Sequence, residues 1–81
     1  FALERSEDAE RNYLQAKTIA IEIGNKRGLL LAELGLGRLH RKLERWADAR
    51  VSFGNAHKIA EEIGHRVALG EANDGLKGLP A

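Results

Sequence analysis

The stretch LLLAELGLGRLHRKLERWADARVSFGNAHKIAEEI, residues 29–63, decides the fold. Apolar residues recur in both halves at alternating steps of three and four: first Leu29, Ala32, Leu36, Leu39 and Leu43, then Trp46, Ala49, Phe53, Ala56, Ala60 and Ile63. This spacing places each set on one face of a helix with about 3.6 residues per turn. A corner at Glu44-Arg45 joins the two helices, and so short a connection makes them antiparallel neighbours. The stretch therefore predicts a helical hairpin.

Composition limits the classes of protein to which the chain can belong. Its 81 residues make one domain at most, and its four aromatic residues predict a core of Leu, Ile and Ala. Thirteen basic and 12 acidic residues give a net charge of +1, too balanced to make nucleic acid or an anionic membrane an obligatory partner. The absence of cysteine excludes disulfides and thiolate metal sites.

The sequence carries neither a membrane span nor a targeting signal. Its longest apolar run, residues 29–32, is far shorter than the roughly 20 residues that a transmembrane helix needs. The chain begins with Phe rather than Met and shows no cleavable signal. We therefore expect a piece of a longer intracellular, cytoplasmic protein.

The sequence repeats itself with a period of 40 residues. Sliding the chain by that distance gives 16 identities in 41 aligned pairs, among them Asp8-Ala9 with Asp48-Ala49 and Glu22-Ile23-Gly24 with Glu62-Ile63-Gly64. Tyr13 falls on Phe53. A period of this length is typical of helical repeat proteins, in which stacked hairpins share one continuous core.

The repeat predicts four helices, at about 6–23, 26–43, 46–63 and 66–79. Gly24 and Gly64 end the first and third, since glycine readily takes the left-handed conformation that closes a helix. Asn25 is the expected N-cap of the second helix, and His65 is a weaker cap for the fourth. Glycines, Asn73 and Asp74 weaken the fourth helix and Pro80 stops it.

Each terminal helix is expected to carry one apolar stripe. The stripe of the first helix consists of Ala9, Tyr13, Ala16, Ala20 and Ile23, and that of the fourth consists of Leu69, Ala72, Leu76 and Leu79. Because such stripes need a cover, we expect the last helix of one chain to dock on the first helix of another. The result would be a closed dimer or a continuous superhelix, and the alternative is a monomer with a disordered tail.

The central hairpin resembles the tetratricopeptide repeat family, in the longer variant of about 40 residues. The resemblance rests on Leu36-Gly37, His40, Leu43, Trp46, Ala49, Phe53 and Ala56. It implies an all-α fold of antiparallel hairpins stacked as a superhelix, with a half repeat at 1–24, a full repeat at 25–64 and a half repeat at 65–81. The implied function is recognition or scaffolding of a protein partner on the concave surface, which the first helix of each hairpin lines.

A second stripe of the helix at 26–43 matches those groove positions. It consists of Leu31, Leu34, Arg38, Arg41 and Lys42. A stripe with apolar and basic ends suits an acidic, partly apolar peptide, because arginine forms bidentate bonds with carboxylates. The alternative is that the basic residues form a solvated face and that Leu31 and Leu34 contact a neighbouring helix.

No catalytic, metal or cofactor site is predicted. His40, His57 and His65 lack the spacing of metal ligands, and His40 occupies a helix-packing position. Gly35-Leu36-Gly37 lies inside a helical pattern rather than after a strand, so it does not indicate a phosphate loop. No nucleophile, base and orienting group can be assembled, and we expect the chain not to be an enzyme.

Two other functions remain open at this point. The hairpins could form a structural segment of a larger regulator, with another part of that polypeptide in the groove. The chain could also bind nucleic acid through a basic set consisting of Lys26, Arg27, Arg38, Arg41, Lys42, Arg45 and Arg50. Strong salt dependence of binding would identify the latter, since neutralising phosphates releases counterions.

Overall fold

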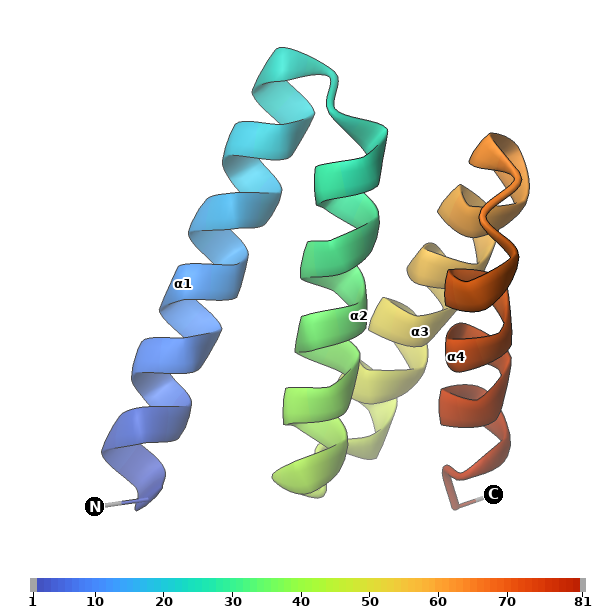
Figure 1. The fold of residues 1–81 in the computed structure, drawn as a ribbon. Helices are drawn as coiled ribbons and strands as arrows, with labels where there is room; N and C mark the ends of the chain where they lie inside the picture. Colours follow the sequence, from blue (N-terminus) through green and yellow to red (C-terminus); the bar gives the residue numbers. More distant parts are fainter. Residues whose placement is uncertain (1, 81) are drawn as a thin grey trace.

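The structure is a computed structural model that describes residues 2–80, with side chains from Arg5 onward. These residues form four helices and no strand: α1 (Ala2–Ile23), α2 (Lys26–Lys42), α3 (Trp46–Ile63) and α4 (Arg66–Lys77). Each helix runs antiparallel to the one before it (Figure 1). The predicted all-α class is therefore confirmed.

The helix boundaries follow the sequence signals except at the start of α1 and at the end of α4, which ends at Lys77 rather than near residue 79. The prediction began α1 at residue 6, whereas this helix begins at Ala2. Residues 2–5 are Ala, Leu, Glu and Arg, all good helix formers, so nothing stops the helix from extending into them. The acidic pair Glu7 and Asp8 therefore lies within α1 rather than in its first turn.

The three connections close their helices in the same way. Gly24 and Gly64 have φ 69° and Glu44 has φ 60°. The next residue then donates its backbone N–H to a carbonyl five residues back, in the pairs Asn25 N to Ala20 O, Arg45 N to His40 O and His65 N to Ala60 O, at 2.8–2.9 Å. These bonds satisfy carbonyls that would otherwise lack a partner at each helix end.

Both predicted N-caps are present. Asn25 Oδ1 accepts a hydrogen bond from Gly28 N at 3.0 Å at the start of α2. His65 Nδ1 accepts from Ala68 N at 3.1 Å at the start of α4. The imidazole thus caps its helix in the same position as the amide.

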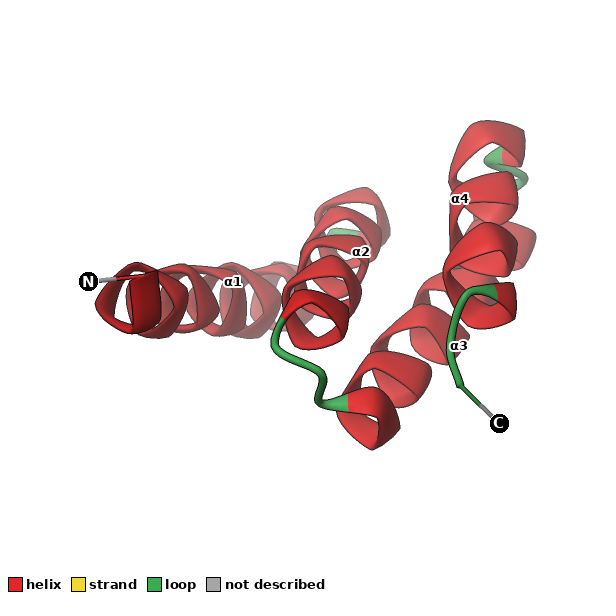
Figure 2. Ribbon diagram, turned by 90° about the horizontal axis from the view of Figure 1, so that it is seen from below, coloured by secondary structure: helices red, strands yellow, loops and turns green. Residues whose placement is uncertain are grey.

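The helix α2 lies at the centre of the arrangement. It contacts α1, α3 and α4, whereas α1 contacts α2 alone among the described helices. Seen along the helices, α1 stands apart at one end and α3 and α4 lie together at the other (Figure 2). The molecule measures 37 × 31 × 17 Å, so it is too thin to enclose more than one narrow core.

The core lies between α2, α3 and α4, and Phe53 is its largest fully buried side chain. The buried cluster contains Leu30, Leu34, Ala49, Phe53, Ala56, Ile59, Ala60, Ala68 and Ala72. Burial of Phe53 confirms the prediction from the sequence spacing, which placed this residue on the apolar face of the helix at 46–63. Its ring is bounded by Gly37 of α2 and by Gly75 of the following helix α4, a contact that the sequence analysis did not foresee.

The sequence repeat appears in the structure as a repeated ring-on-glycine contact. The ring of Phe53 lies against Gly75, and the ring of Tyr13 lies against Gly35, 40 residues earlier in both partners. The two contacts differ in burial, because Phe53 is 1% exposed and Tyr13 is 37% exposed. Tyr13 is therefore free to move where Phe53 is not.

Because of this difference, we expect replacement of glycine by alanine to destabilise the fold at Gly75 but not at Gly35. A Cβ added at Gly75 would lie 2.5 Å from Phe53 Cε1, and the same ring also lies against Gly37 of α2. We expect Gly75→Ala to lower the free energy of unfolding by roughly 1–3 kcal/mol. In Gly35→Ala the exposed Tyr13 ring can turn away, and the gain in helix propensity of about 1 kcal/mol offsets the crowding. Urea unfolding of both variants measures the difference, and equal losses would contradict it.

Two predicted apolar stripes are placed differently in the structure. On α1 only Ala20 is buried, while Ala16 and Ile23 are exposed, because α1 has a single neighbour. The stripe predicted for the fourth helix already packs within its own chain. Ala72 is buried, and Leu69, Leu76 and Leu79 pack against the core. The expectation that α4 offers an exposed apolar stripe to another chain is therefore wrong.

Candidate protein-recognition face

The predicted groove residues lie on α2 but not all on its surface. Leu31 is 62% exposed and Lys42 is exposed as well. Leu34 is 3% exposed and belongs to the core cluster with Ala68 and Ala72 of α4. The prediction of an accessible Leu34 is wrong, because α4 covers this part of α2.

The two arginines of the stripe each have a partner within the chain. Arg38 Nη2 donates a hydrogen bond to Glu71 Oε2 of α4 at 2.5 Å. Both side chains remain about half exposed, and such a surface ion pair contributes at most about 1 kcal/mol. The Arg41 guanidinium stands over the Phe53 ring, 5.5 Å from its centroid. The remaining face, formed by Leu31, Arg38, Arg41 and Lys42, is called the recognition face below.

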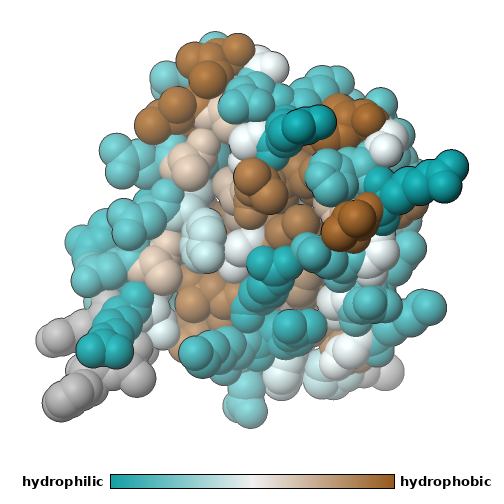
Figure 3. Space-filling view, viewed as in Figure 1, coloured by the Kyte–Doolittle hydropathy of each residue, from teal (hydrophilic) through white to brown (hydrophobic). Residues whose placement is uncertain are grey.

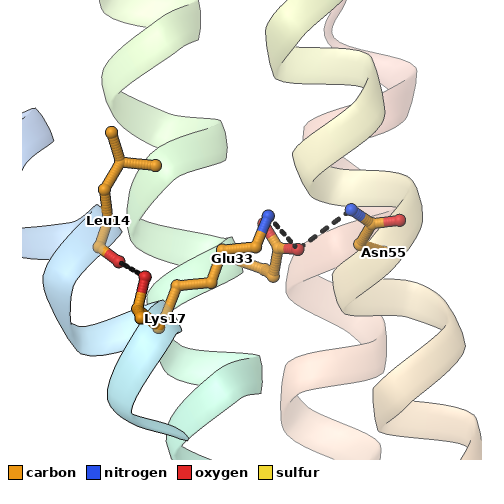
Figure 4. A network of polar contacts seen from close by, with 5 residues as sticks. Leu14, Lys17, Glu33 and Asn55 are labelled. Atoms are coloured by element: carbon orange, nitrogen blue, oxygen red, sulfur yellow. Dashed lines mark hydrogen bonds and ion pairs between the residues drawn. The ribbon is translucent and has the colours of Figure 1, made fainter. Parts of the chain in front are cut away.

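A buried carboxylate behind this face ties three helices together. Glu33 is 2% exposed; its Oε2 accepts from Asn55 Nδ2 of α3 at 2.9 Å and lies 3.3 Å from Lys17 Nζ of α1. Figure 4 shows Glu33 between these two partners, with Leu14 accepting a hydrogen bond within α1. The other oxygen of Glu33 has no hydrogen-bond partner among the described residues. Glu33 was not predicted as a site residue, although it is the lone charged residue in the otherwise apolar stretch 29–36.

A second polar contact holds α1 to the corner before α3. Glu10 Oε2 lies 3.1 Å from Arg45 Nη1 and 3.9 Å from His40 Nε2. His40 is 8% exposed, as expected for a helix-packing position. These contacts and the Glu33 pair lie on the same side of α1, away from the recognition face.

The remaining histidines have separate local roles. His57 Nδ1 lies 3.3 Å from Glu61 Oε1 one turn along α3, and His65 caps α4. Among the side chains described, from Arg5 to Pro80, no three His, Cys, Asp or Glu gather in a group that could hold a metal ion.

The basic set considered for nucleic acid is partly neutralised. Three of its seven members lie beside carboxylates: Lys26 with Glu62, Arg38 with Glu71 and Arg45 with Glu10. Arg50 donates to the backbone oxygen of Pro80 at 2.7 Å. The set therefore does not form one continuous patch of free cations.

The pair between Lys26 and Glu62 joins the start of α2 to the end of α3. Lys26 Nζ donates to Glu62 Oε2 at 2.6 Å. This hydrogen bond, and then the charge of Lys26, lower the pKa of the Glu62 carboxyl below its ordinary value of 4.5, and Lys58 adds a smaller effect in the same direction. Since the pKa is lower in the folded state, the pair stabilises the fold above the unfolded-state pKa. That stabilisation is lost as the pH falls through the folded-state pKa.

We therefore expect Lys26→Met to raise the pKa of Glu62 toward its ordinary value. Carboxyl-carbon NMR titration measures the change directly. Lys17→Met, which removes a cation beside a different carboxylate, is the matched control and leaves the Glu62 titration in place. An unaltered titration in Lys26→Met would show that the pair does not form in solution.

No helix in the described part of the chain has the length and apolarity needed to cross a bilayer. Comparison with protein-family models, with curated proteins and with solved structures finds no match to this chain. Its function must therefore be argued from its own residues.

Proposed function

We propose that the chain is a tetratricopeptide-like repeat module that recognises a protein partner through the recognition face. The observation that carries this proposal is the exposure of Leu31 on the helix that also carries the exposed cations Arg38, Arg41 and Lys42. Leu31 is 62% exposed and offers an apolar contact to a partner, and Arg38 follows it seven residues later, about two turns along the same face. Figure 3 shows one face of the molecule, on which hydrophobic side chains lie among hydrophilic ones.

The internal repeat supports the tetratricopeptide-like arrangement. The 40-residue period in the sequence corresponds to repeated helix closures, repeated caps and the repeated ring-on-glycine contact. In a stacked array of such hairpins, α2 and α4 are equivalent helices and lie side by side on one surface. The Arg38–Glu71 pair between them lies on that surface.

The partner that suits this face best is an acidic, partly apolar peptide. A carboxylate of the peptide can replace Glu71 at Arg38, because the existing pair is exposed and weak. Arg41 and Lys42 offer further cations one turn along α2, and Leu31 offers the apolar contact. Leu34 has no part in this proposal, since it is buried.

The test is a binding measurement with a library of acidic peptides. We expect Arg38→Glu with Arg41→Glu to weaken binding of the selected peptides at least about tenfold, since each charge-assisted hydrogen bond contributes about 1.5–3 kcal/mol. Lys58→Glu with Arg66→Glu makes the same change in net charge at exposed positions elsewhere and should leave binding nearly unchanged. Equal affinities for the two double variants would refute the recognition face.

A further inference from the structure

The chain has a second exposed surface, which lies on α1 and is separate from the recognition face on α2. Among the side chains that the structure describes, eight large hydrophobic ones are exposed, and five of these are on α1, including Ile19 at 48% and Ile23 at 69% exposure. Ala16, Ile19 and Ile23 follow at steps of three and four and so form one flank of the helix. Figure 3 shows hydrophobic side chains over the upper, C-terminal end of α1 on this side of the molecule.

The internal repeat shows what covers such a flank. Ala56, Ile59 and Ile63 stand 40 residues later on α3 and are identical in type to these three residues. On α3, Ala56 and Ile59 are buried and Ile63 packs against the core that Leu30 and Leu34 of α2 help to form. The same stripe is therefore covered by α2 in one repeat and bare in the other.

The aromatic ring beside the flank is also half covered. The Phe53 ring lies against Gly75 of α4 and also against Gly37 of α2. The equivalent Tyr13 ring meets Gly35 but remains 37% exposed. A second glycine, equivalent to Gly37, is the contact that Tyr13 lacks.

Charge complementarity defines the missing helix further. Glu62 binds Lys26, the first residue of α2, and Asn55 donates to Glu33 seven residues later. The equivalents of Glu62 and Asn55 on α1 are Glu22 and Gln15, and both are exposed. They are placed to meet a cation and a carboxylate at the same seven-residue spacing.

We propose that this flank of α1, lined by Ala16, Ile19 and Ile23, is a docking surface for an amphipathic helix of a partner protein. The helix runs antiparallel to α1, with a basic residue in its first turn facing Glu22. An acidic residue seven positions later faces Gln15, and a glycine eleven positions after the basic residue lies on the Tyr13 ring. The spacing is that of Lys26, Glu33 and Gly37 in α2.

A second copy of this chain does not supply such a helix. The repeat equivalent of α2 is α4, in which Gly70, Asp74 and Lys77 replace Leu30, Leu34 and Gly37. Lys77 would stand where the ring needs a glycine, and Gly70 and Asp74 remove the two leucines that bury the stripe. Ala68 and Ala72 of α4 are moreover already buried within their own chain.

The probe for the experiment is a synthetic peptide with the sequence of residues 25–43. It is added to the full 81-residue chain carrying NMR-labelled Ile, Leu and Val methyl groups. We expect the methyl signals of Ile19 and Ile23 to shift in a saturable way, while those of Val51 and Val67, which are equally exposed elsewhere, stay in place. A peptide carrying Gly37→Lys is the matched control and should bind at least about tenfold more weakly, because it crowds the Tyr13 ring.

A charge exchange tests the polar part of the interface. Glu22→Lys in the chain should weaken binding of the peptide, and Lys26→Glu in the peptide should restore it. Ile19→Asp changes an exposed residue, should leave the fold intact and should abolish the shifts.

Several outcomes would overturn the proposal. The first is equal binding of both peptides, and the second is the absence of any shift at millimolar peptide. The third is a set of shifts spread through α3 and α4, which would mean that the peptide displaces the chain's own α2. Concentration-dependent shifts of Ile19 and Ile23 without peptide would assign the flank to self-association instead. These tests leave Arg38 and Arg41 of the 81-residue chain unchanged, so failure here is distinguishable from failure of the recognition face.

Discussion

Phe53→Ala is expected to lower the free energy of unfolding by about 3–5 kcal/mol, which is comparable with the whole stability of a domain of this size. Phe53 is 1% exposed and its ring fills the space between Gly37 and Gly75. Neither glycine has a side chain that could move into the cavity, so α2 and α4 would both lose their contact with this ring. The variant should be largely unfolded at room temperature.

Tyr13→Ala is the matched control, because Tyr13 is the repeat equivalent of Phe53. It also removes an aromatic ring from a glycine contact, but that ring is 37% exposed and serves α1 and α2 alone. We expect a loss of roughly 1–2 kcal/mol. Thermal melting followed by circular dichroism compares the two variants, and a cooperative transition of Phe53→Ala near the parent temperature would show that Phe53 is not a core residue.

Leu30→Ala is expected to cost about 2–5 kcal/mol, the second largest effect. Leu30 is fully buried in the cluster between α2, α3 and α4. The change leaves helix propensity almost unaltered, since alanine is at least as good a helix former as leucine. The loss therefore measures the apolar contact and the cavity.

Its neighbour Leu31 provides the control within the same turn. Leu31→Ala makes the same chemical change at a side chain that is 62% exposed, and we expect an effect within about 0.5 kcal/mol. Urea unfolding at equilibrium gives both values. Similar losses for the two leucines would mean that α2 is rotated about its axis relative to this structure.

The helices could be predicted from the sequence because the residues that end and cap a helix act on the backbone within a few positions of themselves. Gly24 and Gly64 end their helices in the left-handed conformation, and Asn25 caps the next one through its own side chain. The early start of α1 was missed because residues 2–5 contain no signal that would either begin or prevent a helix.

The candidate sites were less accessible to prediction, because a residue's exposure depends on helices distant in sequence. Leu34 and Leu31 are three positions apart and matched the same groove pattern, yet only Leu34 is buried, in the cluster that α2 forms with α3 and α4. Glu33 stands out in the sequence as a lone acid, but its partners Lys17 and Asn55 come from two other helices and could not be predicted from it. The bare flank of α1 likewise became visible only when its exposure was compared with that of α3.

The sequence by itself determined that this chain forms four helices in a 40-residue repeat with Phe53 in its core. The reason is that period, caps and closing glycines act within a few residues of one another. Only the tertiary structure decided which faces stay open. Because α4 packs on α2 and α3, its leucines contact the core and Glu71 pairs with Arg38. The helix α1 contacts only α2 among the described helices, so one flank of α1 stays exposed. Exposure follows from how the helices stack, and stacking depends on contacts between all of them at once.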